Sequence, residues 1–148
     1  MRYRSWTRVV TGCIALGGVA VAATPAAAQR PAGAAAVVFT IPLARPGTAQ
    51  FGTAQLTVTP TSGQVCYRLT TAHLAPVLAA HIHAGAAGVN GPIVVPLFGY
   101  SPPKTWTLFT GCVRAARPLL AAILHDPTAY YVNVHTTQYP AGAIRGQL

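Results

Sequence analysis

Short runs of β-branched, aliphatic and aromatic residues, separated by Pro and Gly, dominate the chain after position 37. Runs of this length, bounded by turn residues, are typical of β-strands. Turn signals include Pro46-Gly47, Asn90-Gly91 and the prolines that follow Ser101. We expect strands at residues 37–41, 52–59, 64–70, 79–83, 93–97, 105–113, 130–136 and 143–148.

This spacing of strands predicts an all-β fold, an antiparallel Greek-key-like β-sandwich or barrel of about eight strands. One stretch departs from it. Residues 118–124 read PLLAAIL, with Pro118 near the start and Asp126-Pro127 just beyond the end. Proline is tolerated in the first turn of a helix and stops a helix when it follows one, so we expect one short helix here.

In two of these expected strands, apolar and polar residues alternate. Because successive residues point to opposite faces of a strand, the alternation places the two kinds of side chain on different faces. In segment 131–135 two valines share one face, and the other face carries Tyr131, Asn133 and His135. In segment 81–83 both histidines lie opposite Ile82. If the aliphatic faces point to the core, His81, His83 and His135 look away from it, onto an outer sheet face or into a groove. The pattern leaves open whether the two strands are neighbours.

The first 28 residues have the order of a secretory leader. Arg2, Arg4 and Arg8 precede an uncharged apolar run, and small residues at 26–28 end it. We expect a signal peptide at 1–28, a loose N-terminal segment at 29–36 and one domain at 37–148. The protein is then exported, periplasmic or extracellular, with no membrane span after leader removal.

The charged residues of the chain exclude some classes of function. Three of the ten basic residues lie in the leader, so seven basic residues and one acid remain, a net charge of +6. The basic residues are scattered singly, which argues against nucleic acid. An extracellular protein, an anionic envelope polymer or no charged partner at all fits this distribution better. The chain has no Glu, and Asp126 is its only acid. Paired-carboxylate hydrolysis and carboxylate-rich calcium sites are therefore excluded.

Cysteine count points to a crosslink. Cys13 leaves with the leader, and Cys66 and Cys112 remain. Two cysteines in an oxidising compartment most simply form one disulfide. A thiol nucleophile or a cysteine metal ligand is the alternative.

Two ordered motifs resemble a known family. Segments 80–85 (AHIHAG) and 88–95 (GVNGPIVV) resemble the central signature of the chordin-type (CHRD) domain. Segments 130–136 (YYVNVHT) and 140–148 (PAGAIRGQL) resemble its C-terminal signature. The resemblance runs over residues 37–148. It implies a small extracellular β-domain, found in the secreted protein chordin and as single-domain bacterial exported proteins, without a settled biochemical activity.

A weaker similarity is to copper-zinc superoxide dismutase. It implies that His81 and His83 match the first copper ligands, His135 a later one, and Arg145 the arginine that attracts anions. The departures are a missing His-rich zinc loop and a missing acidic zinc ligand. A fourth copper histidine would have to come from outside any matching motif, from His73 or His125.

The histidines admit two interpretations. Three imidazoles with an open position suit copper or zinc, with Tyr131 or Asn133 orienting a ring nitrogen. The simpler interpretation, which we favour from sequence, is structural hydrogen bonding within turns. Arg145 has three alternative partners: Asp126, the terminal carboxylate or an anionic ligand. We expect a non-enzymatic binding or structural module, with a copper-dependent redox enzyme and adhesion to an anionic polymer as alternatives.

Overall fold

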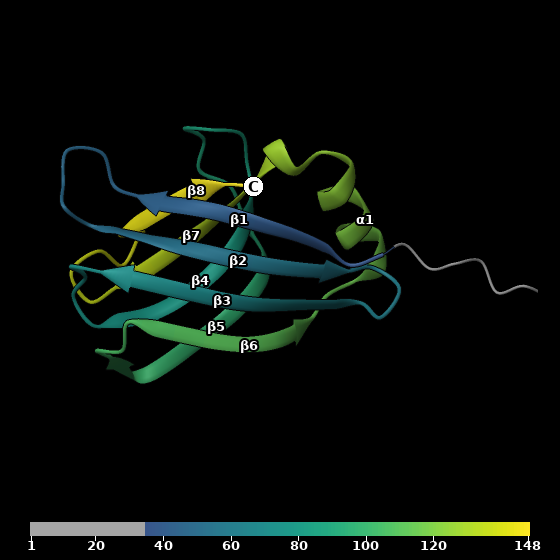
Figure 1. The fold of residues 1–148 in the computed structure, drawn as a ribbon. Helices are drawn as coiled ribbons and strands as arrows, with labels where there is room; N and C mark the ends of the chain where they lie inside the picture. Colours follow the sequence, from purple (N-terminus) through teal and green to yellow (C-terminus); the bar gives the residue numbers. More distant parts are fainter. Residues whose placement is uncertain (1–34) are drawn as a thin grey trace, which may run out of the picture.

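The computed structural model describes residues 35–148, and the expected leader lies outside the described residues. Within them the chain forms eight antiparallel strands and one short α-helix, which confirms the all-β expectation (Figure 1). The elements are β1 (Val37–Ala44), β2 (Phe51–Thr59), β3 (Gln64–Ala72), β4 (Val77–Ala84), β5 (Ile93–Lys104), β6 (Leu108–Arg114), α1 (Arg117–His125), a 3₁₀ turn (Pro127–Ala129), β7 (Tyr130–Thr136) and β8 (Ile144–Gln147).

The strands hydrogen-bond in the order β5-β4-β7-β8-β1-β2-β3-β6. Figure 1 shows β1, β2, β3 and β6 as one layer in front of β4, β5 and β7. The two halves join where β1 meets β8, at the single residue pair Ala44 and Arg145. The end strands β5 and β6 meet through side chains, with the rings of Phe98 and Phe109 stacked 4.9 Å apart. The sheet therefore nearly closes into a barrel.

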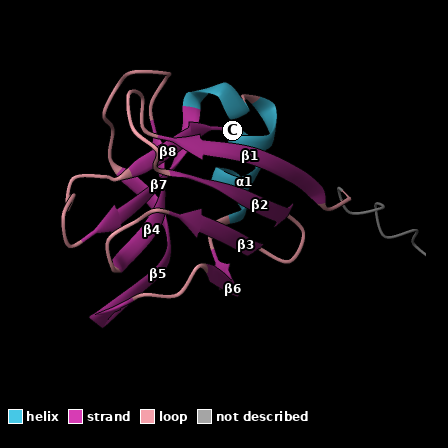
Figure 2. Ribbon diagram, turned by 60° about the vertical axis from the view of Figure 1, so that its left-hand side comes forward, coloured by secondary structure: helices cyan, strands magenta, loops and turns pink. Residues whose placement is uncertain are grey.

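The core is built from the alternating aliphatic residues of both layers. Fully buried side chains include Leu56, Leu69, Ile82 and Val132. Helix α1 covers one end of the sandwich and adds Leu120 and Ile123 to the core (Figure 2). No helix within residues 35–148 is long and apolar enough to cross a bilayer.

One expected turn is wrong. Strand β5 runs on to Lys104 through Ser101 and the two prolines after it, and β6 starts at Leu108 rather than at residue 105. The ladder with β4 is irregular here, because Val77 pairs with Lys104 while Ala79 pairs with Gly99. Prolines lack an N–H donor and are tolerated at such irregularities on an edge strand.

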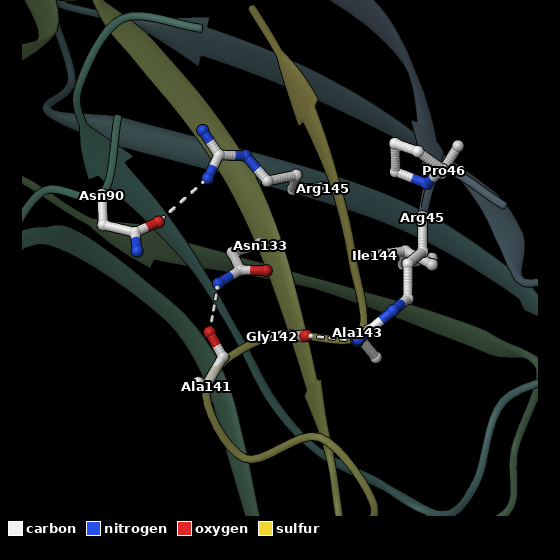
Figure 3. Close-up of a pocket in the computed structure, with 10 residues that line it drawn as sticks. Arg45, Pro46, Asn90, Asn133, Ala141, Gly142, Ala143, Ile144 and Arg145 are labelled. Atoms are coloured by element: carbon white, nitrogen blue, oxygen red, sulfur yellow. Dashed lines mark hydrogen bonds between the residues drawn. The ribbon is translucent and has the colours of Figure 1, made fainter. Parts of the chain in front are cut away.

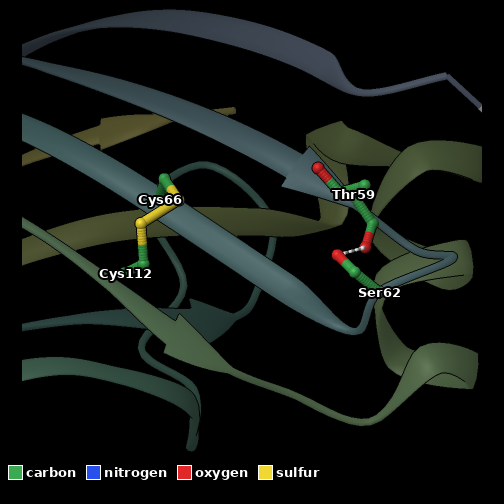
Figure 4. Close-up of a disulfide and its surroundings, with 4 residues drawn as sticks. All are labelled: Thr59, Ser62, Cys66 and Cys112. Atoms are coloured by element: carbon green, nitrogen blue, oxygen red, sulfur yellow. Dashed lines mark hydrogen bonds between the residues drawn. A yellow bond between two sulfur atoms is a disulfide. The ribbon is translucent and has the colours of Figure 1, made fainter.

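The expected disulfide is present. Cys66 on β3 and Cys112 on β6 face each other directly in the ladder, with Cα atoms 3.9 Å apart (Figure 4). The bond ties the last strand of the sheet to its neighbour. The two cysteines are thus neither free nucleophiles nor metal ligands in this fold.

Candidate metal centre

The sequence left open whether the two histidine-bearing strands are neighbours. In the sheet, β4 and β7 are antiparallel neighbours. His81 pairs with Asn133, and Ala79 pairs with His135. The expected parity is confirmed, since Ile82, Val132 and Val134 on the opposite face are fully buried in the core. The three histidines consequently converge on the outward face of one layer.

The cluster is compact. One ring nitrogen from each of His81, His83 and His135 can be chosen so that all three lie within 4.8 Å of one another. His81 Nδ1 lies 3.1 Å from His135 Nε2, a hydrogen-bond distance. The ring centroids of His83 lie 5.8 Å from His81 and 5.9 Å from His135. Such a group is compact enough to share one ion.

Although this face points away from the core, two loops cover it. His83 is only 7% exposed and Tyr131 only 2%. The loop before β5 reaches over them, where the Gly91 N–H donates to the Tyr131 hydroxyl at 3.2 Å. On the other side, Asn133 donates its Nδ2 to the Ala141 carbonyl at 3.2 Å. His83 is therefore sheltered by the loops, while His81 and His135 beside it are half-buried.

Backbone carbonyls fix which nitrogen carries the proton in two of the rings. His83 Nδ1 donates to the Gly91 carbonyl at 2.9 Å, and His135 Nδ1 donates to the Pro140 carbonyl at 2.8 Å. A carbonyl only accepts, so each Nδ1 is protonated and each Nε2 carries a lone pair. Nε2 of His83 is buried and has no hydrogen-bond partner among the described residues. A buried acceptor in that state costs about 1–3 kcal/mol.

Electrostatics favour neutral rings. Burial, together with the nearby His135 and His83, lowers the pKa of His81 from 6.5 to about 4. Burial also lowers the pKa of His135, against an opposing effect of its hydrogen bond to Pro140. Neutral imidazole is the form that binds metal ions.

We expect acid to destabilise the metal-free protein between pH 6.5 and 4. Below pH 6.5 the unfolded chain protonates His81, whereas the folded ring resists protonation until about pH 4. The unfolded state then binds more protons, so the free energy of unfolding falls as the pH drops through this window. Asp126 is the only side-chain carboxylate. The lowered pKa of His135 acts in the same direction, so both rings contribute to this dependence.

Urea unfolding at pH 7, 5.5 and 4.5 measures this dependence. His81→Gln should flatten it, and His125→Gln should retain it, since His125 is exposed at the end of α1. A slope unchanged in His81→Gln would contradict the assignment.

The residues next to the cluster contact the histidine rings and the loop before β5. Tyr131 stacks flat on the His83 ring, at 4.9 Å and 9°. The Arg145 guanidinium lies over the Tyr131 ring at 4.1 Å and donates to Asn90 Oδ1 and the Val89 carbonyl, each at 3.1 Å. Of the partners expected for Arg145, Asp126 is instead bonded to Thr128. The structural hydrogen bonds favoured from the sequence are present at His83 and His135. The sequence did not identify Gly91 and Pro140 as the acceptors, since every residue carries a backbone carbonyl.

The remaining histidines do not join the cluster. His73 follows β3, with its ring 5.8 Å from that of Phe51, and His125 ends α1. Neither belongs to the group of converging ligand nitrogens. The fourth histidine that the similarity to superoxide dismutase would require is therefore not supplied within residues 35–148.

The fold and the site define a disulfide-linked, nearly closed β-sandwich that carries three converging histidines on one sheltered sheet face. The family model of the CHRD domain matches residues 32–148, which is most of the chain. The protein therefore belongs to the CHRD-domain family. Searches of curated proteins and of solved structures gave no match.

Proposed function

We propose that this protein is an exported, non-enzymatic module that binds one copper or zinc ion through His81, His83 and His135. The observation that carries the proposal is the buried Nε2 of His83, which finds no hydrogen-bond partner within residues 35–148 and lies beside two further imidazoles. Metal-binding histidines typically donate their other ring nitrogen to a carbonyl or carboxylate. His83 and His135 both do so.

The geometry requires a small adjustment. Copper and zinc bind imidazole nitrogen at about 2.0–2.1 Å, so ligand nitrogens lie no more than about 4 Å apart. The three ligand nitrogens of the cluster now lie within 4.8 Å of one another. They would have to approach one another by roughly 1 Å to share one ion. The His81–His135 hydrogen bond would be exchanged for coordination. Divalent copper should bind more tightly than zinc, following the usual order of affinities.

Export is supported by the leader-like order of residues 1–28 and by the disulfide, since disulfides persist in oxidising compartments. The proposal is for binding rather than catalysis, because the chain has a single side-chain carboxylate, Asp126, and it is hydrogen-bonded to Thr128. Proton transfer near the cluster would fall to the histidines and to Tyr131, which stacks on His83.

The test is metal content and calorimetric affinity of the oxidised protein beside a His81→Ala/His83→Ala variant. We expect one copper or zinc ion per chain, with affinity reduced at least about 100-fold in the variant. His125→Ala, which removes a histidine outside the cluster, should bind like the unchanged protein. Equal binding by all three proteins, or a variant that only loses stability, would mean that the histidines serve structural hydrogen bonds.

The copper-loaded protein should also be assayed for superoxide dismutation. We expect no more activity than in the copper-treated His83→Ala protein, when both are assayed after unbound copper has been removed by a chelator. Activity abolished by His83→Ala would instead assign a redox enzyme to the same site.

A further inference from the structure

Beside the histidine cluster, a separate pocket of about 170 Å³ opens between the end of β1 and the start of β8 (Figure 3). Its polar lining comes from Arg45, Asn90, Asn133 and Arg145. None of the three clustered histidines lines it. A cavity needs only about 15 Å³ of such space to hold one water. There is consequently room for an anion of several atoms.

Both arginines are held in place by neutral groups. Arg45 lies over the Tyr139 ring at 3.9 Å and donates Nη1 to the Gly142 carbonyl at 3.4 Å. Arg145 lies over Tyr131 and donates one N–H to Asn90 Oδ1 and another to the Val89 carbonyl. A guanidinium has five N–H donors, so several remain for a ligand. Rings and amide oxygens position these cations without neutralising them.

No acidic side chain lines the pocket. Asp126, the chain's only acidic side chain, is absent from the pocket lining and is hydrogen-bonded to Thr128. Figure 3 shows the Arg145 guanidinium turned toward Asn90 and the Arg45 guanidinium turned toward Gly142, so the two cations stand at different sides of the pocket. Guanidinium binds carboxylate and phosphate oxygens through paired, charge-assisted hydrogen bonds. Asn133, buried to 6% exposure, adds an amide to the wall.

We propose that this pocket binds a small oxyanion, a carboxylate or a phosphate, between Arg45 and Arg145. The proposal goes beyond the metal centre and does not depend on it. Arg145 contacts the same Tyr131 ring that stacks on His83. Arg145 therefore contacts both the pocket and the ring that stacks on His83.

Calorimetric titration of the metal-free protein tests this, with inorganic phosphate in one arm and citrate in the other, at constant ionic strength. We expect saturable 1:1 binding of at least one of them. Arg45→Gln and Arg145→Gln should each weaken it about tenfold or more, the effect of losing charge-assisted hydrogen bonds. Arg68→Gln makes the same charge change on an exposed residue of β3 and should bind like the unchanged protein.

Because Arg145→Gln also loses packing on Tyr131, Arg145→Lys and the thermal unfolding of every variant separate binding from folding. Arg145→Lys should recover part of the affinity. Equal weakening in Arg68→Gln, or no saturable binding of either anion, would overturn the proposal. Using metal-free protein keeps the outcome separate from that of the metal test.

Discussion

Replacing Gly91 by alanine is expected to abolish metal binding and to lower the free energy of unfolding by about 3 kcal/mol, the upper end of overpacking costs. A Cβ at this position would overlap the carbonyl oxygen of Ala84. The two backbone segments are held this close because the Ala84 N–H donates to the Pro92 carbonyl at 3.0 Å. The backbone at position 91 would have to move away.

That movement would break the contact that organises the site, since the Gly91 carbonyl accepts from His83 Nδ1 and its N–H donates to Tyr131. Urea unfolding and copper titration measure the two effects. Gly99→Ala on β5 is the matched control, because a Cβ there has nothing within 4 Å. It should leave stability within about 1 kcal/mol and metal affinity unchanged. Wild-type affinity in Gly91→Ala would show that the loop does not position His83.

Loss of the Cys66–Cys112 disulfide is expected to lower the free energy of unfolding by about 3–4 kcal/mol, on the chain-entropy model. The bond closes a loop spanning a sequence separation of 46 residues. It also secures β6, which ends the sheet and, in the part of the chain that the structure describes, pairs along its backbone with β3 alone. Total stabilities of about 5–15 kcal/mol are usual, so the loss is a large fraction.

Urea unfolding with and without reductant measures this loss. A Cys66→Ala/Cys112→Ala variant should match the reduced protein and should not respond to reductant. A difference below about 1 kcal/mol between oxidised and reduced protein would mean that β6 is held by its ladder and by Phe109 packing instead.

Local pattern predicted most strands because a period of two reflects which side chains the core buries. Seven strands follow the predicted segments closely, and β7 matches its segment, residues 130–136, at both ends. The prediction failed at β5, where Ser101 and the prolines after it read as a turn. Prolines in an edge strand carry the same local signal as prolines in a loop. Only the position of β5 at the end of the sheet separates the two cases.

For the candidate site, the sequence by itself determined the chemistry of the parts: three histidines facing away from the core, and two cysteines available for one bond. Only the tertiary structure decided that these residues lie close together. His81 and His135 are 54 residues apart, and Arg45 reaches Gly142 across 97. Strand order and loop closure bring such groups together, and these depend on long-range pairing that no local alternation of side chains encodes. The carbonyls of Gly91 and Pro140 likewise could not be singled out from the sequence. Every residue carries a backbone carbonyl, and only the tertiary structure determines which of them point at the histidines.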